Sequence, residues 1–131
     1  MLVDSSVFID FFNGRQTAQT DVLVAAIGQE VVLVADLVMV EVLQGFSDDR
    51  EFERTRRVLE SLDPIVVSDT ATALLAAQYY RQLRRIGRTP RKTIDTLIAT
   101  RCIVDGIPLL FSDRDFDPFV QHCGLVSAID G

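Results

Sequence analysis

Residues 1–10 have the sequence MLVDSSVFID, in which a short apolar run ends at Asp4 and a helical pattern follows. An aspartate at this point has two interpretations. It can cap the following helix, because Asp and Ser are preferred N-cap residues. It can also face the crevice outside the carboxyl end of a strand, where open α/β sheets bind ligands. The positions of the other carboxylates are needed to choose between them.

Short apolar runs rich in Val, Ile and Leu alternate with helical patterns along the chain. Strands that alternate with helices form a parallel sheet covered on both faces. The predicted strands are MLV (1–3), VVLV (31–34), PIVV (64–67), PLLF (108–111) and GLVSAI (124–129). The predicted helices span residues 6–13, 17–28, 36–46, 49–62, 70–86, 93–105 and 116–122. No linker or repeat separates them, so we predict one domain over residues 1–131.

The composition narrows the class of protein. A chain of 131 residues with 48% apolar residues can bury a hydrophobic core. Its two cysteines, Cys102 and Cys123, lack the C-x-x-C spacing of a zinc knuckle and do not suggest a disulfide framework. Nothing resembles a signal peptide, and no apolar run reaches membrane-spanning length. We therefore expect a cytoplasmic protein that does not contact a membrane.

The net charge of −6 argues against a protein that coats nucleic acid without specificity, because such binding depends on neutralising many phosphates. The charge is unevenly distributed, however. Residues 1–80 carry five arginines against thirteen acids, whereas residues 81–131 carry eight basic residues against six acids. A local surface for nucleic acid is therefore compatible with the sequence.

Acidic residues follow the first and the fourth predicted strands. Asp4 follows MLV, and Asp113, Asp115 and Asp117 follow PLLF. These two strands can be neighbours in a parallel sheet, which would bring their acids to the same edge. Each of these acids also has an ordinary explanation, since Asp4, Asp113 and Asp115 can cap helices and Asp117 can be solvated.

Two further acids lie on predicted helices. Glu41 interrupts the apolar stripe of residues 36–46, and a buried carboxylate is costly unless it is paired or bound to a metal. Asp95 shares a helical face with apolar residues of the segment 93–105. The alternatives are that Glu41 pairs with an arginine or lies at the rim, and that Asp95 only complements the helix dipole.

Four carboxylates that converge on one end of a sheet would make a more specific site than any one of them. Clusters of oxygen ligands suit Mg²⁺ or Mn²⁺ and do not suit zinc. These ions activate water for attack on a phosphodiester and stabilise the leaving oxygen. The acids therefore point to hydrolysis of a phosphate ester.

Four acidic motifs follow one another along the chain: LVDSSVFIDFF (2–12), VMVEVLQGF (38–46), KTIDTLIA (92–99) and LLFSDRDFDPF (109–119). Taken in order, they resemble those of a PIN-domain ribonuclease of the VapC toxin family, from type II VapBC toxin–antitoxin systems. The resemblance covers essentially the whole chain and implies a three-layer α/β/α fold with a central parallel sheet of about five strands.

The resemblance implies roles for individual residues. The catalytic and metal-binding acids would be Asp4, Glu41, Asp95 and Asp113, with Asp115 as a frequent fifth. Ser6 matches a hydroxyl residue that supports the first Asp. Phe111 stands where the family commonly has Thr, and Ser112 could supply the missing hydroxyl.

The same resemblance implies an activity and partners. It implies an endoribonuclease that depends on Mg²⁺ or Mn²⁺ and acts as the toxin of a VapBC-type pair, with RNA as its substrate. The partners would be a VapB-type antitoxin and a second copy of the chain in a homodimer, alone or in a higher assembly with the antitoxin. An antitoxin segment would cover the active-site groove. Other candidate targets for it are the surface of Phe8, Phe11 and Phe12 and the mixed-charge helix at residues 48–60.

A basic stripe precedes the third acidic motif. Arg81, Arg84, Arg85 and Arg88 have helical spacing, and Arg91 and Lys92 then lead toward Asp95. No acid lies between residues 81 and 92, so this stripe could guide a phosphate backbone to the metal site. The alternative is a solvated helix face. We assign RNA binding to Arg84, Arg85, Arg88, Arg91 and Lys92.

Two other functions remain alternatives. A receiver-type signalling domain is also a small parallel α/β protein with an acidic pocket, but it needs a phosphoacceptor Asp after a central strand and a Lys after a late one. The only lysine here, Lys92, precedes a helix instead. The second alternative is a catalytically inactive PIN-like binding module, which activity after addition of metal would distinguish from the enzyme.

Overall fold

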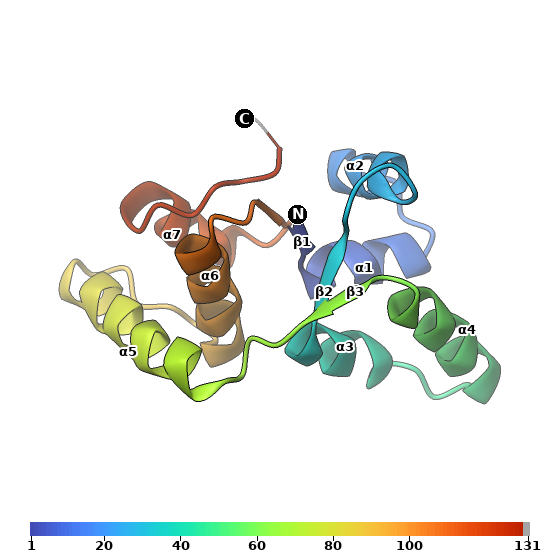
Figure 1. Cartoon of the computed structure of the whole chain (residues 1–131), viewed down its shortest axis with the longest axis horizontal. Helices are drawn as coiled ribbons and strands as arrows, with labels where there is room; N and C mark the ends of the chain where they lie inside the picture. The colour runs from blue at the N-terminus through green and yellow to red at the C-terminus, as the bar shows by residue number, and fades with distance from the viewer. Residues whose placement is uncertain (130–131) are drawn as a thin grey trace.

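The structure, a computed structural model, describes residues 1–129. Its strands form one parallel sheet in the order β3-β2-β1-β4 (Figure 1). Leu2 in the central strand β1 pairs with Leu33 of β2 on one side and with Leu109 of β4 on the other. The strands are β1 (Leu2–Val3), β2 (Leu33–Ala35), β3 (Asp63–Ile65) and β4 (Leu109–Leu110).

Helices lie on both faces of the sheet, as the alternating pattern predicts. Figure 1 shows α1 to α4 gathered on one side of the strands and α5, α6 and α7 on the other. The three-layer α/β/α arrangement is therefore confirmed. The helices are α1 (Ser5–Phe12), α2 (Ala18–Ala26), α3 (Asp36–Leu43), α4 (Asp49–Glu60), α5 (Thr70–Arg85), α6 (Thr93–Asp105) and α7 (Asp117–His122), with a 3₁₀ turn η1 (Arg114–Phe116) before α7.

The sheet has four strands within the described residues, and the prediction of about five was wrong. The fifth predicted strand, at residues 124–129, makes an isolated parallel bridge between Leu109 and Ser127. The N–H of Leu109 donates to the carbonyl of Val126, and the N–H of Ala128 donates to the carbonyl of Leu109, both at 2.9 Å. Because β4 is only two residues long, its outer edge offers the chain one site of pairing rather than a ladder.

The core explains why the strands have continuous apolar sequences. All four residues of β1 and β4 are buried, because helices cover both faces of the sheet. Phe8, Phe116 and Phe119 bring three buried rings against them from α1, η1 and α7. Full burial of each such side chain contributes roughly 1.5–3 kcal/mol. This packing fixes the ends of β1 and β4, where the acids follow.

None of the helices formed by residues 1–129 is both long enough and apolar enough to cross a membrane.

Candidate metal centre

The sheet brings the acids of distant segments to one edge. Asp4 follows β1 and Asp113 follows β4 within three residues, and these two strands run side by side in the same direction. The N–H of Asp4 donates to the carbonyl of Leu110 at 2.9 Å, which extends the pairing to the start of the acidic loop. Glu41 comes from α3, which directly follows β2, the other neighbour of β1.

Asp4 caps α1 and still has a free carboxylate oxygen. The residue is 2% exposed, and its Oδ2 accepts from the backbone N–H of Ser6 at 3.1 Å and from the Ser6 hydroxyl at 2.7 Å. Its Oδ1 is buried and has no hydrogen-bond partner among residues 1–129. Burial raises the pKa of Asp4 although the Ser6 hydrogen bonds oppose the shift. The capping interpretation is therefore confirmed, and it leaves one oxygen available to a cation.

Glu41 is half-buried and, like Asp4, has a carboxylate oxygen without a hydrogen-bond partner among residues 1–129. Its Oε1 is buried without a partner, and no basic side chain of residues 1–129 lies within ion-pair distance of it. The expected alternative, a pairing with arginine, is therefore not found in this part of the chain. Burial raises the pKa of Glu41, and the negative charge of Asp4 raises it further. A cation placed near Glu41 would favour its ionised form and oppose both effects.

Asp95 lies in the first turn of α6 but is not a surface residue at a helix end. The residue is 5% exposed, and no group in the described part of the chain forms a hydrogen bond to its Oδ2. Burial, followed by the charge of Asp4, raises its pKa to about 7, although the nearby charge of Lys92 opposes the shift. The helix dipole favours an acid here. It does not account for burial of the carboxylate without a partner.

The acidic loop completes the cluster. Asp95, Asp113 and Asp115 each offer a carboxylate oxygen, and these three oxygens lie within 4.8 Å of one another. Oδ1 of Asp113 caps η1 by accepting from the N–H of Asp115 at 2.9 Å. Oδ2 of Asp113 accepts from Nζ of Lys92 at 3.2 Å. Asp117, at the start of α7, is not a member of this group.

Ser6 and Ser112 join the two acidic segments in an unexpected way. The Ser6 hydroxyl, which donates to Asp4, accepts from the backbone N–H of Ser112 at 3.2 Å. Ser112 therefore contacts this network through its main chain, whereas the sequence suggested its hydroxyl. Phe111 is half-buried, and its ring packs on Phe116 with centroids 5.2 Å apart. A core contact thus occupies the position at which the resemblance implies Thr.

The donor set fits a hard divalent cation. We call Asp4, Glu41, Asp95, Asp113 and Asp115 the acid cluster. Three of its oxygens are buried without partners among residues 1–129, and its side chains are all carboxylates, the type of ligand that Mg²⁺ and Mn²⁺ prefer. Buried polar atoms are normally hydrogen-bonded, so the orphaned oxygens of Asp4, Glu41 and Asp95 require an explanation. The group of oxygens within 4.8 Å of one another comes from Asp95, Asp113 and Asp115 and does not include Asp4 or Glu41. Besides burial, the charge of Asp4 nevertheless raises the pKa values of Glu41 and Asp95, and a cation bound near these carboxylates would offset that repulsion.

The predicted RNA-binding residues do not form one uniform stripe. Arg84 stacks over the ring of Tyr80 at 5.9 Å, and Arg85 is exposed at the end of α5. Nη1 of Arg88 donates to Oε1 of Gln121 at 3.1 Å. Arg91 lies 3.9 Å from Asp115. These basic side chains therefore differ in how free they are to contact a ligand.

A groove of about 380 Å³ adjoins the acid cluster on its basic side. Arg88, Arg91 and Arg114 line it together with Asp115 and Asp117, and Asp115 also belongs to the acid cluster. Arg114 was not predicted from the sequence, because an arginine between two acids in SDRDFD suggests local charge balance. Only its position in the lining of the groove, together with residues 87–91, reveals it.

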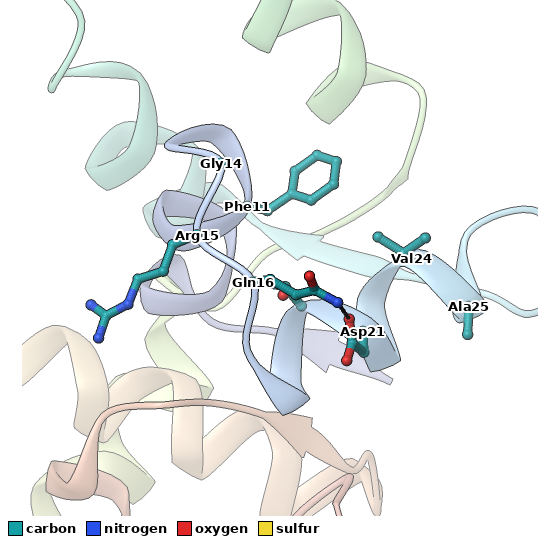
Figure 2. A pocket seen from close by; sticks show the side chains of 8 residues that line it. Phe11, Gly14, Arg15, Gln16, Asp21, Val24 and Ala25 are labelled. Carbon is teal, nitrogen blue, oxygen red and sulfur yellow. Dashed lines mark hydrogen bonds between the residues drawn. The ribbon is translucent and has the colours of Figure 1, made fainter.

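The aromatic residues of α1 separate into different environments. Phe8 is buried in the core, so the prediction that it forms an exposed partner surface was wrong. Phe11 lines a hollow of about 480 Å³ beside α2, together with Arg15 and Val24 (Figure 2). Phe12 lines a smaller hollow that reaches Glu41. No member of the acid cluster lines the larger hollow, so it is a separate feature.

The chain is similar to known proteins over almost all of its length. The family model described as PIN domain matches residues 1–119. The chain is 28% identical over 130 residues to the ribonuclease VapC11 of Mycobacterium tuberculosis, covering 98% of this chain and 97% of the relative. It is also 28% identical over 125 residues to the ribonuclease VapC1 of Methanocaldococcus jannaschii, covering 95% of this chain and 84% of that protein.

Two solved structures share the fold. VapBC2 from Rickettsia felis, solved with a DNA fragment from its promoter, matches with a TM-score of 0.74 at 16% identity, covering 96% of this chain and 95% of that one. A toxin–antitoxin complex from Klebsiella pneumoniae matches with a TM-score of 0.68 at 19% identity, covering 99% and 98%. At these identities the likeness establishes the arrangement of helices and strands.

Proposed function

Because this chain belongs to the PIN-domain family, we propose that it is a metal-dependent endoribonuclease and the toxin of a VapBC-type toxin–antitoxin pair. Its relatives are ribonucleases by name, and the solved structures of the same fold are toxin–antitoxin assemblies. The observation that carries the proposal is the set of orphaned carboxylate oxygens on Asp4, Glu41 and Asp95 at the carboxyl edge of the sheet.

The proposed ligands are Asp4, Glu41, Asp95 and Asp113, with Asp115 as a further carboxylate of the cluster. A bound Mg²⁺ or Mn²⁺ would supply Lewis-acid activation of water and neutralise charge on the phosphate. The chain itself fixes the carboxylates: Ser6 holds Asp4, and the N–H of Asp115 holds Asp113. Burial keeps competing water away from the orphaned oxygens of Asp4 and Asp95.

The basic groove is the proposed path for the RNA backbone. Arg88, Arg91 and Arg114 present guanidinium groups beside an acid cluster that would otherwise repel phosphate. Arg84 and Arg85 extend the positive charge along the end of α5. A single-stranded segment in the groove would bring a phosphodiester to Asp115 of the acid cluster.

The remaining assignments follow from this proposal. We propose a VapB-type antitoxin and a second copy of the chain as protein partners. We propose the cytoplasm as the compartment, because a ribonuclease toxin acts where cellular RNA is found. Membership of the PIN-domain family removes the receiver-type alternative. The catalytically inactive PIN-like module is the alternative that an activity measurement separates.

The test is cleavage of a mixed RNA pool by the purified chain, followed by sequencing of the new RNA ends. We expect cleavage with Mg²⁺ or Mn²⁺, none with a chelator, and a decrease of roughly 100-fold or more for Asp95→Asn. The matched control is Glu51→Gln, because Glu51 is an exposed acid at the same position in the first turn of α4. Equal activity of wild type and Asp95→Asn, or no cleavage with either ion, would contradict the enzyme assignment.

A further inference from the structure

Lys92 is the only lysine of the chain and lies inside the charge network of the acid cluster. It is the N-cap residue of α6, three positions before Asp95. Its Nζ donates to Oδ2 of Asp113 at 3.2 Å, and its side chain is 55% exposed. A residue predicted to bind RNA is therefore paired with a carboxylate of the same protein.

The Lys92 charge opposes the repulsion within the cluster. Carboxylate oxygens of Asp95, Asp113 and Asp115 lie within 4.8 Å of one another, and the lysine contacts one of these residues directly. Among residues 1–129, the other basic group within ion-pair distance of these carboxylates is Arg91, whose Nη1 lies 3.9 Å from Oδ1 of Asp115. The Lys92 ammonium is therefore the positive charge nearest to the carboxylate of Asp113, where a metal ion would also bind.

We propose that the Lys92 ammonium is a placeholder for the divalent ion: it binds the acid cluster in the metal-free protein and is displaced when the ion binds. The inference rests on the proposed metal site. Oδ1 of Asp113 already accepts from the N–H of Asp115, and Oδ2 accepts from the Lys92 ammonium, so an ion bound by Asp113 would compete with the ammonium for Oδ2. An ion pair with a half-exposed lysine is weak, and its flexible stem lets the ammonium move away without change in the helix.

Displacement also gives Lys92 a place in substrate binding. Once it is released from Asp113, the ammonium stays tethered beside Arg91, which lines the basic groove. A free ammonium there is a point charge suited to a phosphate oxygen. The lysine would thus stabilise the metal-free protein and then favour RNA only after the ion is in place.

The first experiment observes Lys92 directly. Reductive methylation with ¹³C-formaldehyde labels two amines, Lys92 and the N-terminus, and keeps both charges. The N-terminal amine donates to the carbonyl of Val31 and serves as the internal reference. During a titration with Mg²⁺ in the absence of RNA, we expect the Lys92 methyl signal to shift with the midpoint of ion binding and the reference signal to stay. A Lys92 signal that does not move while the ion binds would overturn the inference.

The second experiment compares variants by calorimetry with Mn²⁺. Lys92→Met should bind the ion roughly two- to fivefold more tightly, because no ammonium competes. It should also melt at a lower temperature than wild type without metal, because the repulsion is no longer offset. Lys92→Arg keeps the charge and should bind like wild type. Arg85→Met removes one exposed charge away from the cluster and controls for net charge.

The outcomes separate this inference from the proposed function. If Lys92→Met binds Mn²⁺ with unchanged or weaker affinity, while wild type binds it, the placeholder role is wrong and the metal site stands. If wild type binds neither Mg²⁺ nor Mn²⁺, the metal site fails and the inference fails with it.

Discussion

The hydroxyl of Ser6 donates a 2.7 Å hydrogen bond to Oδ2 of Asp4. The hydroxyl oxygen of Ser6 in turn accepts from the backbone N–H of Ser112, 106 positions later in the chain. One hydroxyl therefore ties the end of β1 to the loop after β4. Within residues 1–129, this arrangement leaves Oδ1 of Asp4 as the oxygen without a partner.

Ser6→Ala should destabilise the protein and weaken its metal site. The substitution removes one donor to a buried carboxylate and leaves the N–H of Ser112 without its acceptor, at a cost of about 1–2 kcal/mol. Thermal and urea unfolding measure this decrease. Ser112→Ala is the matched control, because the contact of Ser112 uses its backbone, and we expect its stability to equal that of wild type. Equal stability of Ser6→Ala and wild type would show that the bond contributes nothing.

The pH dependence of stability should reveal the acid cluster in the metal-free protein. Burial raises the pKa values of Asp4, Glu41 and Asp95, that of Asp95 to about 7. Unfolded carboxyls titrate near pH 4, so the folded state binds more protons between about pH 4 and 7. The stability from these groups is present below the unfolded pKa and is lost as pH rises through the folded pKa.

We therefore expect the melting temperature of wild type to fall relative to Asp95→Asn between about pH 5 and 7.5, because the variant lacks this titration. Millimolar Mg²⁺ should raise the melting temperature of wild type most at the high end of this range, because the ion binds the ionised carboxylates. Scanning calorimetry with and without chelator measures both effects. If the melting temperatures of the two proteins depend on pH in the same way, the pKa of Asp95 is not raised in the folded protein.

Neutralising the basic groove should weaken RNA binding. Replacement of Arg88, Arg91 and Arg114 by Gln should flatten the salt dependence of binding to a single strand by about 0.7 log unit for each phosphate that is no longer neutralised. Fluorescence anisotropy with a catalytically inactive background and a labelled single strand measures the slope. The control triple, with the same change in net charge, is Arg50, Arg54 and Arg57 on α4. If the two triple variants show the same salt dependence of RNA binding, the groove arginines do not contact the RNA and are only solvated.

Expression of the chain without a partner should arrest growth, because an open ribonuclease site degrades the RNA of its host. The comparison is wild type against Asp4→Asn, in which a proposed ligand loses its charge while the N-cap bonds to Ser6 can persist. Growth curves and soluble protein levels are followed together. Unimpeded growth with both soluble proteins would remove the toxin assignment and leave an inactive or housekeeping PIN domain.

Much of the site could be predicted from the sequence, because its acids occupy positions with a simple local meaning. Asp4 and Asp113 follow apolar strands, and carboxyl ends of parallel strands meet at one edge. Glu41 interrupts an apolar helical face, which marks a buried polar group. The hydrophobic periodicity and the order of strands and helices are therefore enough to predict that these acids lie at the same end of the sheet. They are also enough to predict the α/β fold. The roles assigned to these acids remain proposals.

Other features depend on which distant groups meet, and local pattern holds no information about that. Lys92 and Arg91 belong to one basic run, yet Lys92 pairs with Asp113 while Arg91 lines a groove together with Arg114. Phe8 is buried while Phe11 lines a hollow, because their exposure is set by α2 and the sheet packed around them. The last apolar run forms a single bridge because β4 offers it two residues of edge. Whether a side chain is buried and which charge it pairs with depend on tertiary packing. That packing brings together segments that are far apart in the sequence, so local sequence patterns cannot predict it.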